Sequence, residues 1–140
     1  MYKVISVAMM TVLLAACSAL TPKTDEEQVT RRAEQRMQAF QKMDFEKAYS
    51  FMSPGYRSAN SIRHFEADHI GLPAARDYKV VGVECAEDRC EVMMELWFKM
   101  SEVMGIAGAR ADAGQDVLTD MVFREVWIRL DGKWWALKNK

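Results

Sequence analysis

The stretch FREVWIRLDGKWWAL, residues 123–137, decides the fold. Together with the two residues before it, its first part alternates in the way of a strand that buries one face. Asp131-Gly132 is typical of a two-residue type I′ turn, in which both positions need positive φ. The apolar run KWWALK, residues 133–138, then returns as a second strand. The stretch therefore predicts a β-hairpin that ends the domain.

Two further strands are predicted upstream of this hairpin, over DYKVVGVEC, residues 77–85, and CEVMMELWFKM, residues 90–100. Both are rich in β-branched, aromatic and Met residues, which favour strands. In the second strand, one apolar set alternates with a mixed set that includes Trp97. The segment between the sheet halves, residues 101–120, has three glycines and little pattern. We expect a loop there, with either a short helix or extensions of the strands.

Cys85 and Cys90 lie at the ends of these two strands, separated by four polar or small residues. A hairpin would place them opposite each other, and cross-strand neighbours are within disulfide reach. A structural disulfide is the favoured interpretation. A redox pair would more often have the spacing C-x-x-C, and a zinc site would need four ligands. We expect no metal and no cofactor.

Helical patterns fill the first half of the domain. Thr24 and Glu27 form a capping box, and an apolar stripe with spacings of four, four and three then follows to residue 40. Asp44 caps a second helix, which Ser53-Pro54-Gly55 is expected to end. A third helix is predicted over residues 61–70. The order of elements predicts an α+β domain with three N-terminal helices packed on a four-stranded antiparallel sheet.

The first residues look like a targeting signal. One basic residue precedes an apolar run over residues 4–16, which is too short to span a bilayer but suits a secretory signal. Leu14-Ala15-Ala16-Cys17 resembles the lipobox of bacterial lipoproteins. That resemblance implies cleavage before Cys17, acyl chains on its sulfur, and a lipid-anchored protein that faces the periplasm. Ser18, rather than Asp, implies sorting to the outer membrane. The alternatives are an ordinary cleaved signal or a buried N-terminal helix.

The predicted organisation is a lipoprotein signal peptide over residues 1–16, a lipidated tether over residues 17–23, and one domain over residues 24–140. The whole chain has 140 residues and a formal net charge of −1, which gives no reason to expect nucleic-acid binding. An exported protein meets an oxidising compartment, where a disulfide persists. The charges of the first helix are expected to face solvent. Arg31, Arg32 and Arg36 are also placed to meet lipid head groups near the anchor.

The layout resembles the nuclear transport factor 2-like superfamily, also called the SnoaL or ketosteroid isomerase-like fold. The resemblance rests on MDFEKAYSFMSPGYRS, residues 43–58, and FREVWIRLDGKWWAL, residues 123–137. It implies a strongly curved sheet and a cone-shaped cavity between the sheet and the helices. Residues that we would look for in or at the rim of this cavity are Tyr49, Tyr56, His69, Trp97, Arg124, Glu125, Trp127 and Trp135. The alternative for the aromatic residues is that they simply fill the core.

Enzymes with this fold use an Asp or His base in the cavity together with an oxyanion-stabilising donor. His64 and His69 point in different directions on one predicted helix, although His69 beside Glu125 is conceivable. No familiar catalytic motif occurs, and no catalytic residue is assigned. The many Met residues have no M-x-x-M cluster, so they are interpreted as core filling.

Three functional hypotheses follow from the anchor and the fold. The first is a lipid-anchored binding domain, without catalysis, for an envelope protein partner or a small apolar ligand. The second is a small-molecule enzyme of the isomerase, dehydratase or hydrolase kind that uses the cone cavity. The third is a structural or assembly factor of the envelope that interacts through residues 101–120.

Overall fold

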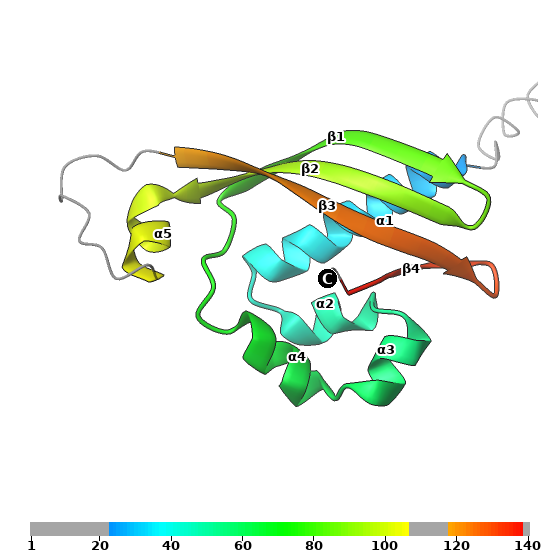
Figure 1. Cartoon of the computed structure of the whole chain (residues 1–140), viewed down its shortest axis with the longest axis horizontal. Coiled ribbons are helices and arrows are strands. Elements are labelled where there is room, and N and C mark those ends of the chain that lie inside the picture. Colours follow the sequence, from blue (N-terminus) through cyan, green and yellow to red (C-terminus); the bar gives the residue numbers. More distant parts are fainter. Residues whose placement is uncertain (1–22, 107–117, 139–140) are drawn as a thin grey trace, which may run out of the picture.

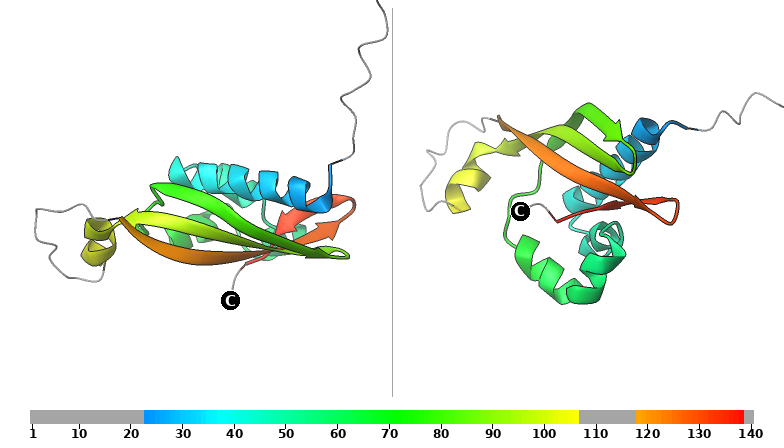
Figure 2. Two further views of the ribbon diagram at one scale, coloured as in Figure 1. Left: turned by 90° about the horizontal axis from the view of Figure 1, so that it is seen from above. Right: turned by 45° about the vertical axis from the view of Figure 1, so that its right-hand side comes forward.

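The structure, a computed structural model, describes residues 23–106 and 118–138. A long helix runs along one face of an antiparallel sheet, and short helices follow it around the edge strand β4 (Figures 1 and 2). Along the chain the elements are α1 (Asp25–Gln41), α2 (Phe45–Ser50), α3 (Pro54–Ala59), α4 (Ile62–His69), β1 (Asp77–Ala86), β2 (Arg89–Lys99), α5 (Met100–Ile106), β3 (Leu118–Leu130) and β4 (Lys133–Ala136). The strand order in the sheet is β1-β2-β3-β4. The predicted α+β fold is confirmed.

The predicted caps of the first two helices are present. The Thr24 side chain accepts the Glu27 N–H, and the Asp44 side chain accepts the Lys47 N–H. The segment at residues 53–55 differs from the prediction, because it begins a helix as well as ending one. Ser53 caps α3 and Pro54 occupies its first turn, where a missing N–H costs nothing. Four helices rather than three therefore precede the sheet among the described residues.

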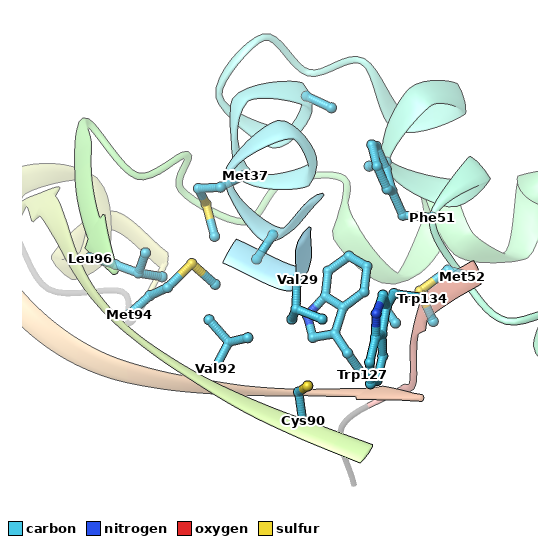
Figure 3. Close-up of a cluster of buried hydrophobic side chains, with 14 of the residues drawn as sticks. Val29, Met37, Phe51, Met52, Cys90, Val92, Met94, Leu96, Trp127 and Trp134 are labelled. Atoms are coloured by element: carbon cyan, nitrogen blue, oxygen red, sulfur yellow. The ribbon is translucent and has the colours of Figure 1, made fainter. Parts of the chain in front are cut away.

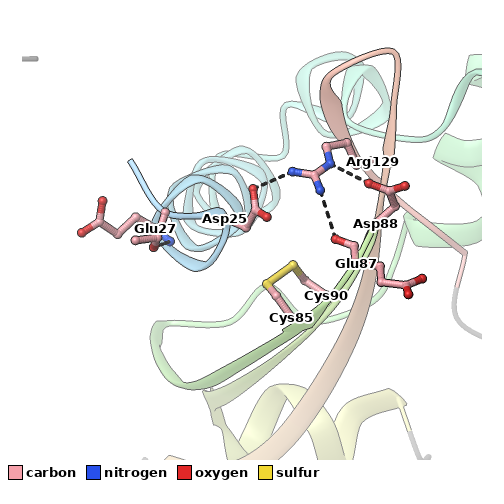
Figure 4. The surroundings of a disulfide bond; sticks show 8 residues. Asp25, Glu27, Cys85, Glu87, Asp88, Cys90 and Arg129 are labelled. Carbon is pink, nitrogen blue, oxygen red and sulfur yellow. Dashed lines mark hydrogen bonds and ion pairs between the residues drawn. A yellow bond between two sulfur atoms is a disulfide. The ribbon is translucent and has the colours of Figure 1, made fainter. Parts of the chain in front are cut away.

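Both hairpin turns are formed as the sequence predicts. Asp131 and Gly132 have φ of 51° and 72°, the positive values that a type I′ turn needs. At the other turn, Cys85 pairs with Cys90 and the two form a disulfide (Figure 4). Arg129 lies beside this turn, where its guanidinium donates to Asp88 at 2.7 Å and to Asp25 at 2.8 Å. This contact ties the start of α1 to the end of the sheet.

The segment over residues 101–120, predicted as a loop with either a short helix or extensions of the strands, contains both a short helix and a strand extension. α5 takes its first residues, and β3 begins at Leu118, before the alternating pattern becomes clear in the sequence. The remainder, residues 107–117, lies outside the described residues.

The core fills the space between α1 and the inward face of the sheet (Figure 3). Alternate residues of β2 are buried and meet the apolar stripe of α1, as the two periodicities predict. Trp127 and Trp134 are the largest fully buried side chains. Labelled members of this core are Val29, Met37, Phe51, Met52, Cys90, Val92, Met94 and Leu96.

The proposed lipobox, with Cys17 and Ser18, lies in residues 1–22, outside the described part of the chain. Among the described residues, no helix is long and apolar enough to cross a membrane.

Candidate functional site

Two adjoining cavities open between the sheet, α1 and α4. The first has a volume of 390 Å³ and is lined in part by Tyr56, Asp68 and Lys138; we call it the polar cavity. The second has a volume of 250 Å³ and is lined mainly by aliphatic and aromatic side chains; we call it the apolar cavity. Both cavities share the same four residues in their walls: Arg36, His69, Phe123 and Glu125. These four residues are the centre of the candidate site.

Arg36 and Glu125 form an ion pair inside the protein. Arg36 lies on the buried face of α1, between Ala33 and Met37, and Glu125 points inward from β3, between Phe123 and Trp127. They expose only 8% and 2% of their surfaces. Burying a lone charge costs several kcal/mol, so each residue is tolerated here because the other is present.

Both oxygens of the Glu125 carboxylate have a donor. Arg36 Nη1 donates to Oε1, and Trp127 Nε1 donates to Oε2 at 3.0 Å. The carboxylate of Glu125 is therefore held in place by two buried donors from two different elements.

Arg36, in contrast, has more donors than acceptors. A guanidinium carries five N–H groups. One nitrogen binds Glu125, Nη2 meets only the weakly accepting Sδ of Met52 at 3.5 Å, and Nε is buried with no acceptor among the described residues. The guanidinium also lies 4.8 Å above the Phe40 ring. Its position in the walls of both cavities makes it the natural donor to an oxygen of a bound molecule.

His69 is fixed at the end of α4. Its Nδ1 lies 2.7 Å from the carbonyl oxygen of Phe65, which can only accept, so Nδ1 carries the proton of that bond. The ring packs against Phe65 and Phe40, with centroid distances of 4.3 and 5.1 Å. This leaves Nε2 as the ring nitrogen that a ligand can use.

An exposed ion pair lies at the polar cavity. Lys138 Nζ donates to Asp68 at 2.9 Å and so joins the segment after β4 to α4. This hydrogen bond lowers the pKa of Asp68 and raises the pKa of Lys138. Burial raises the pKa of the neighbouring Tyr56, which remains a neutral donor.

Among the predicted cavity residues, Tyr56, His69 and Glu125 line the polar cavity. Tyr49 and Trp127 do not line either cavity. The Tyr49 hydroxyl donates to the Asn60 carbonyl at 2.7 Å, and Trp127 is completely buried in the core. Trp127 thus belongs to the core, and Tyr49 is partly buried and packs against it.

Trp97, Arg124 and Trp135 also line neither of the two cavities. Trp97 and Arg124 alternate with inward residues, so their side chains project from the opposite face of the sheet. Arg124 is exposed and pairs there with Glu91. Trp135 is half-buried between two arginines, Arg32 and Arg57.

Three charged residues of the site were not among the predicted cavity residues: Arg36, Asp68 and Lys138. Arg36 had been expected to face solvent or lipid, but it falls on the buried face of its helix. Its helical position was the available signal, because residues 29, 33, 36 and 40 share one face. Nothing in the local sequence joins Asp68 to Lys138. Among the described residues, no group of His, Cys, Asp and Glu has the arrangement of a metal site.

No protein-family model matches this sequence, and no curated protein matches it. Solved structures do match the fold. A proposed NTF2-like transpeptidase from Campylobacter jejuni has a TM-score of 0.51 and 11% identity over 79% of this chain and 98% of its own. A proposed dehydratase of the NTF2-like family from Streptomyces avermitilis has a TM-score of 0.52 and 17% identity over 83% and 93%.

A SEC-C motif containing protein from Psychrobacter arcticus matches with a TM-score of 0.57 and 13% identity, over 81% of this chain and 60% of its own. At such identities the likeness concerns the fold alone. The likeness to the two NTF2-like structures supports the predicted nuclear transport factor 2-like domain. NTF2 is the abbreviation of nuclear transport factor 2.

Proposed function

We propose that this protein is a lipid-anchored binding protein of the bacterial cell envelope. Its domain holds one small amphipathic molecule, with an apolar body in the apolar cavity and an oxygen-bearing head at Arg36. The observation that carries the proposal is the excess of donors on a buried arginine that both cavities share. The lipobox-like sequence at Cys17 supports the anchor, and Ser18 supports the periplasmic face of the outer membrane.

The shape and chemistry of the two cavities support a ligand with two unlike ends. The apolar cavity is lined by side chains such as Phe40, Leu72, Leu96 and Phe98, which offer an alkyl or ring system no polar partner. At the shared wall, Arg36 has donors to spare and His69 has a free Nε2. A carboxylate or carbonyl oxygen accepts a hydrogen bond from a guanidinium better than the sulfur of Met52 does.

The state of Glu125 favours binding over catalysis. Enzymes need a base that is free to take a proton in the transition state. Glu125 already accepts from Arg36 and from Trp127, and both bonds are buried. A pre-organised ion pair of this kind fixes the position of Arg36 for a ligand without changing protonation itself.

The test compares sodium decanoate with decylammonium by calorimetric titration of the full chain. The two probes share an alkyl body and differ in the head, and the surplus donors of Arg36 predict binding of decanoate at least about tenfold tighter. Equal affinities, or no binding of decanoate, would remove the ligand proposal.

A matched pair of variants locates the site. Leu72 lines the apolar cavity and is 53% exposed, whereas Ile70 is 69% exposed and lines neither cavity. Leu72→Ser is expected to weaken decanoate binding about fivefold, because roughly half of a leucine side chain loses apolar contact. Ile70→Ser is expected to leave the affinity unchanged. An equal effect of the two would place the ligand elsewhere.

The anchor has its own test. Cells labelled with an alkyne analogue of palmitate should yield a labelled protein whose chain begins at Cys17, and Cys17→Ser should abolish the label. A chain that keeps residues 1–16 and carries no fatty acid would refute the anchor.

A second candidate function is a small-molecule enzyme, and one observation favours it. His69 and Tyr56 line the same polar cavity, and His69 offers a free Nε2 that can exchange a proton. The related fold from Streptomyces avermitilis is a proposed dehydratase. Incubation with a small-molecule extract of the envelope should then consume a compound. His69→Gln should stop that consumption while decanoate still binds.

A further inference from the structure

A second group of side chains lies apart from the two cavities. Arg32 places its guanidinium 5.0 Å from the Phe51 ring centroid and 5.7 Å from that of Trp135. Arg57 lies 5.1 Å from the same Trp135 ring, and Lys47 lies 5.6 Å from Phe51. We call these five residues, Arg32, Lys47, Phe51, Arg57 and Trp135, the cation–aromatic patch. None of them lines either cavity.

The three cations of this patch have no acidic partner. Among residues 23–106 and 118–138, no ion pair involves Arg32, Lys47 or Arg57. The residues one turn away from Arg32 toward each end of α1 include Gln28 and Gln35 rather than acids. Of the two carboxylates at the start of α2, Asp44 is engaged as the N-cap, and Glu46 forms no ion pair with Lys47. The three cations therefore lie together without a salt bridge to any carboxylate of the described residues.

Two of the three cations also carry unused donors. The Nε atoms of Arg32 and Arg57 are buried without an acceptor in the described part of the chain. Burial lowers the pKa of Arg32, and no carboxylate offsets this effect. A buried N–H without an acceptor is costly, so an anion that reaches both guanidinium groups would be bound strongly for its size.

We propose that the cation–aromatic patch docks the domain onto the phosphate groups of anionic phospholipids in the membrane that holds the anchor. This proposal rests on the lipid anchor of the proposed function. Arginine binds phosphate oxygens through its planar fork of donors. Trp135 supplies an amphipathic ring of the kind that is enriched at the membrane interface. The patch thus combines the two side-chain chemistries that a phospholipid surface recognises.

The length of chain before α1 favours a membrane over a soluble acidic partner. Residues 18–24 separate the lipidated Cys17 from the first residue of α1, and a chain of that length spans at most about 25 Å. Arg32 lies about 10 Å along the helix from Asp25, at 1.5 Å per residue. An anchored domain therefore holds this patch within reach of the head groups.

The expected size of the effect suits a tethered domain. Each basic side chain at an anionic leaflet raises the docked population about fivefold. Three cations thus give about a hundredfold, which is weak for a free protein but decisive when the tether supplies a high effective concentration. The docked state is also expected to be sensitive to salt.

The test uses the full chain coupled by its Cys17 thiol to a maleimide lipid in vesicles. In a chain produced without acylation, Cys17 supplies the thiol for coupling, because the other two cysteines, Cys85 and Cys90, are joined to each other. Energy transfer from tryptophan to a dansyl head-group lipid reports docking. We expect at least about twofold more transfer in phosphatidylglycerol-containing vesicles than in pure phosphatidylcholine. The difference should vanish in about 1 M salt, where the Debye length is about 3 Å.

The decisive variants remove the same net charge from different places. Arg32→Gln/Arg57→Gln should abolish the dependence on phosphatidylglycerol. The control Arg63→Gln/Lys79→Gln removes two exposed cations outside the patch and should preserve it. Lys47→Gln changes an exposed side chain and should lower the ratio of docked to free protein about fivefold.

Two results would overturn the proposal: no dependence on phosphatidylglycerol in the unmodified sequence, or an equal loss in the control. If the patch double variant fails to fold, an unchanged ratio with Lys47→Gln overturns it as well. Chemical coupling supplies the tether in every arm. A protein without natural acylation at Cys17 would therefore refute the anchor while leaving this measurement valid.

Discussion

Arg32 and Arg36 lie one turn apart on α1, and they occupy opposite surroundings. Arg36 is 8% exposed and forms an ion pair with Glu125 at the wall of both cavities. Arg32 is partly exposed and meets only aromatic rings, with no carboxylate partner in the described residues. One helix therefore carries one compensated and one uncompensated arginine.

The difference shows that residue type and helix position do not determine what an arginine does. Glu125 reaches Arg36 from β3, far along the chain, and turns a costly buried charge into a fixed feature of the site. Arg32 has no such partner, so it contributes little to stability beyond its contacts with aromatic rings. We infer that Arg36 organises the interior of the domain, whereas Arg32 binds a surface outside the molecule.

The largest expected effect on stability comes from a substitution of Arg36, the arginine that has a carboxylate partner. Arg36→Met leaves Glu125 buried without its cation, and breaking a buried pair in this way costs about 3–5 kcal/mol in the free energy of unfolding. Guanidinium denaturation, followed by tryptophan fluorescence, measures it.

A double-mutant cycle shows whether the pair is the cause. Glu125→Gln keeps an oxygen that can accept from Trp127 but removes the charge. The double variant Arg36→Met/Glu125→Gln should recover at least about 1 kcal/mol relative to the sum of the single changes. Additive losses would mean that each residue acts through its packing alone.

The disulfide offers an intermediate effect that involves neither arginine directly. Cys85→Ala/Cys90→Ala opens a six-residue loop, which costs about 2 kcal/mol in the chain-entropy model. Decanoate binding and vesicle docking should both survive, because neither the cavities nor the cation–aromatic patch includes a cysteine. Denaturation midpoints, together with the two binding assays, test this expectation. Loss of either activity would show that destabilisation alone is enough to mimic a site variant.

A substitution of Arg32, which has no carboxylate partner among the described residues, should hardly change the free energy of unfolding. Arg32→Met removes cation–π contacts worth about 0.5–1 kcal/mol, and it also relieves an unpaired, partly buried charge. The two effects oppose each other, so the unfolding free energy should shift by less than about 1 kcal/mol, while docking falls. Arg31→Met, at an exposed neighbouring position, is the control. A loss as large as that of Arg36→Met would erase the distinction between the two arginines.

The sequence predicted the fold well where one pattern determines one element. Alternation in β2 and the turn at Asp131-Gly132 depend on local geometry alone, and both occur as predicted. The helix that begins at Pro54 was not predicted, because Ser53-Pro54 can follow the end of one helix and also start the next. Local rules indicate a helix boundary at these residues, but they do not say whether a helix ends or begins there.

The site was harder to predict because it joins distant parts of the chain. Only the sheet register brings Glu125 to Arg36, so neither residue alone announces the pair. Trp97 lies on the opposite face of the sheet from Leu96, as the alternation of a strand requires.

The smallest effect concerns a third arrangement, an ion pair that remains in water. Lys138 lowers the pKa of Asp68, so the pair stabilises the fold above the unfolded pKa of about 3.9. That contribution is lost as the pH falls through the lower folded value. The pKa of Lys138 is raised, so its contribution is present below about pH 10.4 and is lost as the pH rises through the higher folded value.

Asp68→Asn and Lys138→Gln should therefore lower the melting temperature slightly and equally at pH 7. The difference from the unmodified protein should shrink toward pH 3, where Asp68 becomes protonated. Thermal melts across this range measure it. Because both side chains are solvated, salt should remove most of the effect, whereas it should hardly change the cost of Arg36→Met. If salt acted equally on both, solvent exposure would not be what separates this pair from the buried one, and the contrast between the two sides of α1 would need another cause.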